Sequence, residues 1–580
     1  MEQLLTRRRF LELAAKGVAA SALGSSILST AGSLAEASVK RKDGKPNILY
    51  ILNDHQAFYG HGTYGGPRIS RPNFERLAAG GVEFTRAYCA SPLCGPSRRT
   101  MLTGLFPHNH GEIKNDVNHA YDREVYLDIL ADNGYANYYF GKWHAGPGTA
   151  KDHHSQGFSY PSYNNPYTKP EYKDYLKKKN LPDFEVRIER SFMCSKEDAE
   201  KARKDNPDAP RAAVPGETYR CHGAWCNPHV TGVMTSPEET HEAIFLANLA
   251  CEQLKNLASS GSDQPWSMRV DFWGPHAPYF ASQRFRDLYD PARIPEYPSF
   301  KDDLSGKPEL YKSEHNWPLN KGGKIIHPNP LPWSEWQKAL SLHYAQISLI
   351  DHAGGMILDM LDKLGLADDT LVIWSTDHGD AVACHGGHFD KDGYMPEEML
   401  RIPMAVRWPG KIKPKQKISG LVSNIDLAPT FLDAAEAGFS KPVDGQSLLP
   451  LCTGKSKQWR DDIMCETHGH YRNQAGRMVA TDRYKYIWND DDLEELYDLK
   501  TDPYEMKNLI KSTEHRDVLK HMRERLAKWQ QKSGDNPMSP DSYYQKMKIS
   551  RVADQLPLKL SRNGKNVSIK LKLGDVPGAK

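Results

Sequence analysis

Asn47-Ile48-Leu49-Tyr50-Ile51-Leu52 is a continuous apolar run that ends at Asn53-Asp54. A second run, Thr370-Leu371-Val372-Ile373-Trp374-Ser375, ends at Thr376-Asp377-His378. Short apolar runs of this kind are typical of strands that are buried on both faces. Alternation of such strands with helices predicts an α/β fold with a large, mostly parallel sheet. The helical patterns that lie between the two runs cover residues 126–133, 243–257 and 340–364.

The pattern changes after about residue 455. Residues 477–481 and 484–488 are expected to form antiparallel strands, and a charged helix is expected over roughly 513–532. These elements predict a smaller C-terminal α+β subdomain over 456–535, beside a main domain over 45–455. Within the main domain we expect loop insertions near 150–235 and 281–335.

The tail, residues 536–580, ends in apolar residues at every second position. The alternation runs on both sides of Asn563-Gly564. Because Asn-Gly between two such runs is a strong turn signal, we predict a β-hairpin.

The N-terminal segment 1–37 resembles a twin-arginine export signal. Thr6-Arg7-Arg8-Arg9-Phe10-Leu11 precedes a weakly apolar run, and Ala35-Glu36-Ala37 fits a signal-peptidase site. An amphipathic N-terminal helix or a membrane anchor is the alternative, but Lys16 and the many small residues make a poor bilayer span. We therefore expect the twin-arginine export machinery as a partner and a periplasmic or secreted mature protein.

Composition excludes several classes of protein. The 580 residues carry 76 Lys+Arg and 73 Asp+Glu, a net charge of +3, so no nucleic-acid partner is expected. No stretch after residue 37 is apolar enough to be a stable membrane span. Nine cysteines are too few for a disulfide scaffold, and the odd number leaves at least one outside intramolecular pairs.

Polar residues follow both buried runs. Asp54 comes at the end of the first, and Asp377 and His378 follow the second. Ligands of open α/β sheets bind beyond the carboxyl ends of the strands, so these side chains could form a cation site there. The alternative is that each acid merely caps the helix or turn that follows.

The segment from Cys94 to Gly104 predicts a short helix. Pro96 lies in its first turn and Gly104 at its end. Cys94 would lie at the helix N-terminus, which favours anions, and Arg98 on the same helical face. A buried cysteine on a packed helix is the alternative. A cysteine phosphatase loop also joins a cysteine and an arginine, but with more residues between them, so the spacing of Cys94 and Arg98 does not favour it.

Cys-x-Pro-x-Arg followed by four residues and Thr-Gly resembles the signature of the type I sulfatases. Every element of that signature is present from Cys94 to Gly104. Further matches follow in order along the chain: Gly141-Lys142-Trp143-His144, Pro275-His276-Ala277-Pro278, Thr376-Asp377-His378-Gly379-Asp380, Lys391, Arg401-Ile402-Pro403, Asp426-Leu427-Ala428-Pro429-Thr430 and Glu495-Leu496-Tyr497-Asp498-Leu499.

The resemblance implies an alkaline-phosphatase-like fold and a formylglycine made from Cys94 by a maturation enzyme. It also implies one divalent cation, calcium above all, held by Asp54, Cys94, Asp377 and His378. Arg98 and Lys142 would stabilise the sulfuryl oxygens, and His276 and Lys391 the leaving alcohol. His144 would deprotonate the second hydroxyl of the hydrated aldehyde. The implied catalytic residues are Cys94, Arg98, Lys142, His144, His276 and Lys391.

One position departs from the family pattern. Two adjacent aspartates are common after the first strand, but this chain has Asn53-Asp54-His55-Gln56. His55 or Gln56 could complete the metal site, or the site could manage with fewer ligands. With fewer carboxylates among its ligands, the site would favour calcium less strongly, and a transition metal is the alternative.

We therefore expect an exported sulfatase that acts on sulfate esters, with a sulfated small molecule or glycan as substrate. A phosphonate monoester or phosphodiester hydrolase of the same superfamily is the enzymatic alternative. An inactive sulfated-glycan-binding protein is the alternative of another class. Cys221 and Cys226 near His229 are expected to form a local disulfide or to stay as free thiols, since their spacing does not fit common zinc sites.

Overall fold

The computed structural model describes residues 44–58, 68–161, 166–191, 215–220, 230–315, 331–456, 458–470, 473–535, 557–562 and 565–570. The expected export signal, Cys221, Cys226 and His229 lie outside these residues. No helix in the described ranges combines the length and apolar character needed to cross a membrane.

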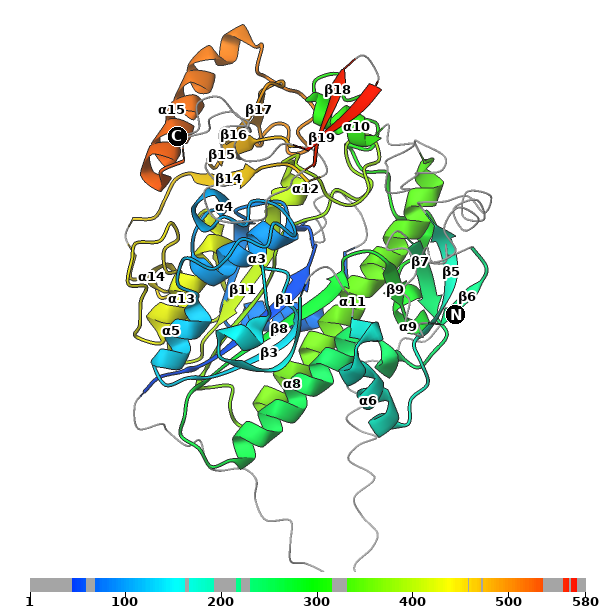
Figure 1. Ribbon diagram of the computed structural model, residues 1–580, viewed down its shortest axis with the longest axis vertical. Coiled ribbons are helices and arrows are strands. Elements are labelled where there is room, and N and C mark those ends of the chain that lie inside the picture. The colour runs from blue at the N-terminus through cyan, green and yellow to red at the C-terminus, as the bar shows by residue number, and fades with distance from the viewer. Residues whose placement is uncertain are drawn as a thin grey trace, which may run out of the picture. The chain divides into compact units, whose positions relative to one another are not determined.

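A nine-stranded sheet forms the centre of the main domain (Figure 1). Its order is β12-β2-β11-β10-β1-β8-β3-β4, with β13 paired to β2. Only β11 runs antiparallel to its neighbours, so the expected large, mostly parallel sheet is confirmed. The strands are β1 (Asn47–Asp54), β2 (Val82–Tyr88), β3 (Ala136–Lys142), β4 (Ser155–Tyr160), β8 (Trp266–Pro275), β10 (Thr370–Thr376), β11 (Arg401–Arg407), β12 (Gln416–Ile418) and β13 (Val422–Ser423).

Strand β1 lies between β10 and β8 because it is apolar on both faces. Leu49 and Ile51 pack in one core and Ile48, Tyr50 and Leu52 in the other. Burying each such side chain contributes about 1.5–3 kcal/mol. Helices α2 (Pro72–Ala79), α8 (Glu242–Ser259) and α11 (Trp333–Lys363) cover the first face, and α3 (Cys94–Thr103), α5 (Tyr126–Asp132) and α13 (Leu427–Ala434) lie against the second.

The approach of α11 to β10 requires glycine at position 354. A Cβ atom there would lie 2.2 Å from the ring of Trp374. The long helix therefore packs directly on the strand that carries Asp377 and His378. Figure 1 shows α8 and α11 running side by side along the sheet.

The C-terminal subdomain has the expected α+β composition. Strands β14 (Ile463–Thr467), β15 (Gly476–Ala480), β16 (Tyr484–Asn489) and β17 (Glu495–Asp498) form an antiparallel sheet in that order. Helix α15 (Arg516–Ser533) is the charged helix expected over roughly 513–532, and it covers the sheet through Met522, Leu526 and Trp529.

The stretch 150–235, expected to be loops, contains regular structure. Strands β5 (Glu185–Ser191), β6 (Thr218–Arg220), β7 (Val230–Met234) and β9 (Tyr279–Ala281) form a second sheet. Val186 and Ile188 are buried although charged residues alternate with them, so composition concealed the strand. Helix α6 (Pro170–Lys179) also belongs to this stretch.

The remaining elements are short. The tail strands β18 (Pro557–Arg562) and β19 (Lys565–Lys570) pair antiparallel, with Arg562 opposite Lys565. The other helices are α4 (Pro107–His110), α9 (Gln283–Arg286), α10 (Glu309–His315), α12 (Glu397–Leu400) and α14 (Leu449–Cys452). The 3₁₀ turns are η2 (Ala150–His153), η3 (Pro166–Thr168), η4 (Glu238–Thr240), η5 (Pro291–Arg293), η6 (Asn424–Asp426) and η7 (Thr513–His515).

The cysteines within the described ranges form no disulfide. All are buried free thiols: Cys89, Cys94, Cys251, Cys384, Cys452 and Cys465.

Candidate active site

Several elements deliver polar side chains to one edge of the central sheet. Asp54 ends β1, Lys142 ends β3, and His276 directly follows β8. Asp377 and His378 directly follow β10. Because these strands are parallel neighbours, their carboxyl ends meet at one edge of the sheet, where the sequence predicted a site.

Helix α3 begins at Cys94 and ends at Thr103 with Gly104 as its C-cap, which agrees with the short helix predicted for this segment. Every residue of this helix is buried, and Gly104 has a left-handed φ of 67°. The backbone N–H of Gly95 donates to Asn115 Oδ1 at 2.8 Å. The helix therefore holds the Cys94 side chain rigidly at its N-terminal end, which favours negative charge.

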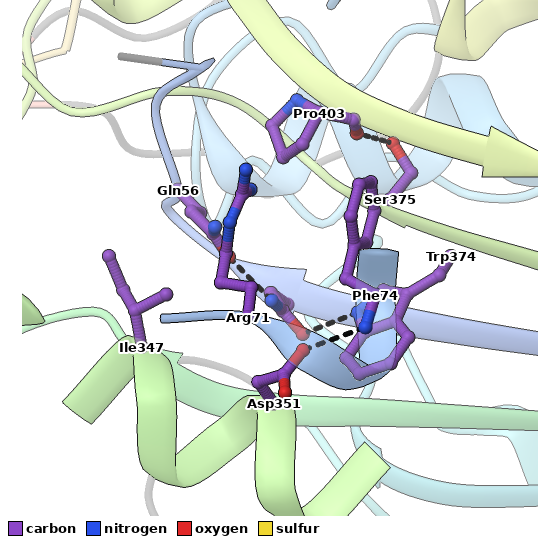
Figure 2. A pocket seen from close by; sticks show the side chains of 9 residues that line it. Gln56, Arg71, Phe74, Ile347, Asp351, Trp374, Ser375 and Pro403 are labelled. Carbon is purple, nitrogen blue, oxygen red and sulfur yellow. Dashed lines mark hydrogen bonds between the residues drawn. The ribbon is translucent and has the colours of Figure 1, made fainter. Parts of the chain in front are cut away.

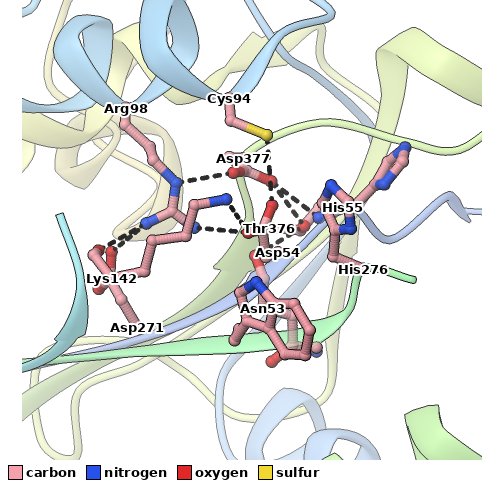
Figure 3. Close-up of polar contacts among 12 residues, drawn as sticks. Asn53, Asp54, His55, Cys94, Arg98, Lys142, Asp271, His276, Thr376 and Asp377 are labelled. Atoms are coloured by element: carbon pink, nitrogen blue, oxygen red, sulfur yellow. Dashed lines mark hydrogen bonds and ion pairs between the residues drawn. The ribbon is translucent and has the colours of Figure 1, made fainter. Parts of the chain in front are cut away.

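Cys94 lies among the predicted metal ligands (Figure 3). Its Sγ is 3.1 Å from His378 Nε2 and 3.5 Å from Asp54 Oδ1. One ligand atom from each of Asp54, Cys94, Asp377 and His378 lies within 4.8 Å of the others, and all four residues are buried. The structure therefore brings the whole predicted donor set together.

The donor set fits a divalent cation. His378 Nδ1 donates to the Gly379 carbonyl at 2.8 Å, which leaves Nε2 as a lone-pair donor toward Cys94. Burial lowers the pKa of His378, which favours this neutral form. Two carboxylates, an imidazole nitrogen and the side chain of residue 94 are ligand types that calcium or a transition metal accepts.

Arg98 is the central cation of the site. Its Nε donates to Asp377 Oδ2 and its Nη1 to Asp271 Oδ2, both at 2.9 Å. Its Nη2 lies 3.6 Å from Asp54 Oδ2 and has no hydrogen-bond partner among the described residues. Since Arg98 is fully buried, this open N–H is a donor in reserve for an anionic ligand.

Lys142 forms a buried ion pair with Asp54. Burial raises the pKa of Asp54, but the positive charges of Lys142 and then Arg98 outweigh this effect. The pKa of Asp54 therefore lies well below its ordinary value. The acid is therefore a carboxylate, ready to bind a cation. Removing either partner would leave an uncompensated buried charge.

His276 and Lys391 contact each other at the side of this group. Lys391 Nζ donates to His276 Nε2 at 2.7 Å and lies 3.2 Å from Asp390 Oδ1. His276 Nδ1 is 2.8 Å from the Ala277 carbonyl, to which it donates. Burial, and then Lys391, lower the pKa of His276 well below its ordinary value, so its imidazole is neutral.

His144 lies two residues beyond Lys142. Its Nε2 is 3.3 Å from Asp116 Oδ1, and its backbone has a φ of 45°. The contact with His144 lowers the pKa of Asp116. The ring is 3 % exposed, which leaves it inside the site rather than on the outer surface.

The two residues that the sequence offered as alternative metal ligands, His55 and Gln56, lie in different surroundings. His55 lies near the site, because its ring centroid is 4.7 Å from that of His378 and its N–H donates to Asp377 Oδ1 at 2.9 Å. Gln56 instead accepts from Asn53 Nδ2 at 2.5 Å and lines a cavity with Arg71 and Asp351 (Figure 2). Gln56 is therefore not part of the Cys94 group.

Three acids of the site were missed in the sequence. They are Asp116, Asp271 and Asp390, which contact His144, Arg98 and Lys391. A signal existed for Asp271, since Ser267, Arg269 and Asp271 alternate with apolar residues on one face of strand β8. Arg269 Nε donates to Asp271 Oδ1 at 2.7 Å.

Comparisons with known proteins agree with this geometry. The sulfatase family model matches residues 46–437, and a family model described as N-sulphoglucosamine sulphohydrolase, C-terminal, matches residues 384–532. A relative from Bacteroides thetaiotaomicron named N-acetylglucosamine-6-O-sulfatase is 27% identical over 519 residues, covering 86% of this chain and 88% of that protein.

Two solved structures show the same fold. One is a complex of a protein with its substrate D-glucosamine-2-N,6-O-disulfate, with a TM-score of 0.62, 22% identity, and coverage of 86% of this chain and 99% of that chain. The other is the phosphonate monoester hydrolase of Agrobacterium radiobacter, with a TM-score of 0.65, 20% identity, and coverage of 84% and 96%. These likenesses confirm the expected alkaline-phosphatase-like architecture.

Proposed function

The chain belongs to the sulfatase family and is a sulfuric ester hydrolase, and on this premise we propose that it removes sulfate from a sulfated carbohydrate. The proposal includes a formylglycine made from Cys94 by a maturation enzyme, and export of the protein to the periplasm or the medium by the twin-arginine route. The observation that carries it is the placement of Cys94 beside Asp54, Asp377 and His378, next to the open N–H of Arg98.

Asp54, Asp377, His378 and the side chain of residue 94 would hold the divalent cation, with calcium as the family expectation. The cation would supply positive charge that offsets the charge on the sulfuryl group. The formylglycine, once hydrated, would supply two hydroxyls on one carbon, one to attack sulfur and one whose deprotonation expels sulfate.

Arg98 and Lys142 bind and orient the sulfuryl group. A sulfate ester is already anionic, so its oxygens need N–H donors and positive charge before a nucleophile can approach. Arg98 Nη2 is such a donor, and Asp271 and Asp377 fix the guanidinium plane that carries it. Lys142 Nζ adds the second positive charge from the end of β3.

Lys391 donates a proton to the leaving alcohol. His276 is neutral and accepts a hydrogen bond from Lys391 Nζ, which places the ammonium at this side of the site. The oxygen of a sugar alcohol is a poor leaving group unless it is protonated, and general acid catalysis of this kind contributes about 10²–10⁴-fold.

His144 takes the proton from the second hydroxyl of the hydrated aldehyde. Asp116 contacts Nε2 of this ring at 3.3 Å and stabilises the imidazolium that the transfer creates. His144 lies two residues after Lys142, so the base and the sulfuryl-binding lysine lie at the carboxyl end of the same strand, β3.

Screening defined sulfated mono- and oligosaccharides for released sulfate tests the proposed function. Sulfate release from one of them, absent in a Cys94→Ala variant, is the expected result. Much faster hydrolysis of an aryl phosphodiester than of any sulfate ester would instead favour a phosphonate or phosphodiester hydrolase. Binding of sulfated glycans with no sulfate released would favour an inactive binding protein.

Metal analysis of protein purified without chelator tests the expected calcium. We expect calcium in the purified enzyme and loss of activity after its removal. A transition metal in its place would contradict the expectation of calcium, and the imidazole nitrogen of His378 among the ligands would explain it.

A further inference from the structure

Strand β8 carries a buried arginine that the proposed mechanism does not use. Arg269 Nε donates to Asp271 Oδ1 at 2.7 Å and its Nη2 to Asp271 Oδ2 at 2.8 Å, so the contact is bidentate. The two residues lie two positions apart and therefore on one face of the strand. Their exposed fractions are only 1 % and 0 %, which makes this an ion pair of the interior.

Aromatic rings flank Arg269 on both sides. Its neighbours across the sheet are Tyr50 on β1 and Tyr139 on β3. The centroids of these rings lie 5.1 and 5.5 Å from Arg269 Cζ, within the range of cation–π contacts. Because all three side chains are buried, solvent screens the charge of the guanidinium only weakly, and that charge acts strongly on Asp271.

Asp271 also accepts hydrogen bonds from two other side chains. Arg98 Nη1 donates to Asp271 Oδ2 at 2.9 Å, and the Tyr139 hydroxyl donates to the same oxygen at 2.7 Å (Figure 3). A carboxylate that faced Arg98 alone would offset the positive charge of that arginine. Because Arg269 already offsets the charge of Asp271, this acid can hold Arg98 in place without cancelling the charge of Arg98.

The other two carboxylates beside Arg98 are balanced in the same way. Asp54 pairs with Lys142, and Asp377 is a ligand in the proposed cation site. Each of the three described carboxylates that Arg98 contacts therefore has a second positive charge in the proposed enzyme. The charge of Arg98 is left for an anion at its Nη2, which has no hydrogen-bond partner among the described residues.

We propose that Arg269 is a positioning residue for sulfuryl binding. By offsetting the charge of Asp271, it lets this acid orient Arg98 while the positive charge of Arg98 stays available to the sulfuryl oxygens. The inference rests on the proposed function, because that function supplies the anion. The alternative is that Arg269 only stabilises the sheet, and sulfate affinity would then not depend on whether Asp271 is charged.

Equilibrium dialysis of the metal-containing enzyme against radiolabelled inorganic sulfate tests the proposal. Arg269→Met should weaken sulfate binding by about 10–100-fold, because Asp271 then offsets the charge of Arg98. Adding Asp271→Asn to this variant should restore most of the lost affinity, because both charges of the pair are then removed together. Arg269→Lys keeps the positive charge and should also retain most of the affinity.

Arg477→Met is the matched control. Arg477 is also buried and forms a bidentate pair with Asp535, but it belongs to the C-terminal subdomain. Its replacement should leave sulfate affinity unchanged. Melting curves of all variants ensure that folded protein is compared.

Three results would overturn the proposal. They are absence of sulfate binding by the wild type, wild-type affinity in Arg269→Met, or a double variant that binds sulfate no better than Arg269→Met. If Arg269→Met alone does not fold, a double variant that binds sulfate more than about tenfold more weakly than the wild type overturns it instead.

The proposed function and this inference fail separately. If the enzyme hydrolyses no sulfated sugar, the proposed function fails, and the order of sulfate affinities among the variants still tests Arg269. If the wild type releases sulfate but the variants do not follow the expected order, only the role of Arg269 is wrong.

Discussion

Two buried ionic clusters in this molecule differ in how completely their hydrogen bonds are made. The strand-end cluster consists of Asp54, Arg98, Lys142, Asp271 and Asp377. The α15 cluster consists of His108, Glu466, Arg477 and Asp535, and joins α4 to the end of α15. Both are shielded from solvent, so burial alone does not separate an active site from a structural contact.

The α15 cluster is closed. His108 Nδ1 donates to Glu466 Oε2 at 2.6 Å and Nε2 to the Ser533 carbonyl at 3.2 Å. Arg477 donates to both oxygens of Asp535, at 2.7 and 3.0 Å. In the strand-end cluster, by contrast, Arg98 Nη2 is buried with no hydrogen-bond partner among the described residues. An open donor in a buried cluster marks the place where a ligand binds.

Replacement of Cys94 should have the largest effect. Cys94→Ala removes the precursor of the nucleophile, and sulfatase activity should fall by about 10⁵–10⁶-fold. Cys94→Ser keeps one hydroxyl but lacks the second, so it should be sulfated once and then stop. Intact-protein mass spectrometry should find one added sulfuryl group, and full steady-state turnover by this variant would contradict the mechanism.

Replacement of Lys391 should affect substrates unequally. Lys391→Met should slow hydrolysis of a sugar sulfate by about 10²–10⁴-fold, because the sugar alcohol needs a proton to leave. An aryl sulfate with a low leaving-group pKa should be affected far less. Equal losses in kcat/KM on both substrates would show that Lys391 is not the donor.

The two buried arginines offer a direct contrast between the clusters. Arg98→Lys should lower kcat/KM by about 10²–10³-fold, because lysine cannot keep both carboxylate contacts and also supply the open N–H. Arg477→Lys, in the α15 cluster, should lower the melting temperature while kcat/KM stays near the wild-type value. A large kinetic loss from Arg477→Lys would break the distinction drawn here.

The α15 cluster should also respond to pH. Burial lowers the pKa of His108, but Glu466 raises it more, to about 9. Because the folded value lies above the ordinary value of about 6.5, the stabilisation is complete below about pH 6.5 and is lost as pH rises through about 9. Across this pH range the contribution of His108 to the free energy of unfolding should fall by roughly 3 kcal/mol.

The His108→Asn variant tests this pH effect, which should be the smallest of the predicted effects. The free energy of unfolding, followed in urea between pH 6 and pH 10, should decline with pH in the wild type and decline less in the variant. Since the His108 ring bonds only Glu466 and the Ser533 carbonyl among the contacts described, kcat/KM near neutral pH should hold. Parallel pH profiles of unfolding for the two proteins would argue against a charged His108.

Local pattern was sufficient to predict β1, β10 and the helix that begins at Cys94, whereas Lys142 and His276 came from the family resemblance, since β3 and β8 were not predicted. The apolar runs that became β1 and β10 placed Asp54 and Asp377 at strand ends, and Pro96 and Gly104 bounded the helix that begins at Cys94. Asp390 and Asp116 could not be predicted, because their roles depend on the path of loops that bring them to Lys391 and His144. The second sheet was missed because β6, β7 and β9 are only three to five residues long and β5 alternates apolar with charged residues.

The central claim is that the residue encoded as Cys94 performs sulfate-ester hydrolysis on a sugar. The most direct measurement is sulfate released from defined sulfated monosaccharides, with the peptide that contains residue 94 analysed by mass spectrometry in the same preparation. We predict sulfate release in proportion to the fraction of chains that carry formylglycine at position 94. Release that is equally fast when residue 94 is entirely an unmodified thiol, or is alanine, would contradict the account.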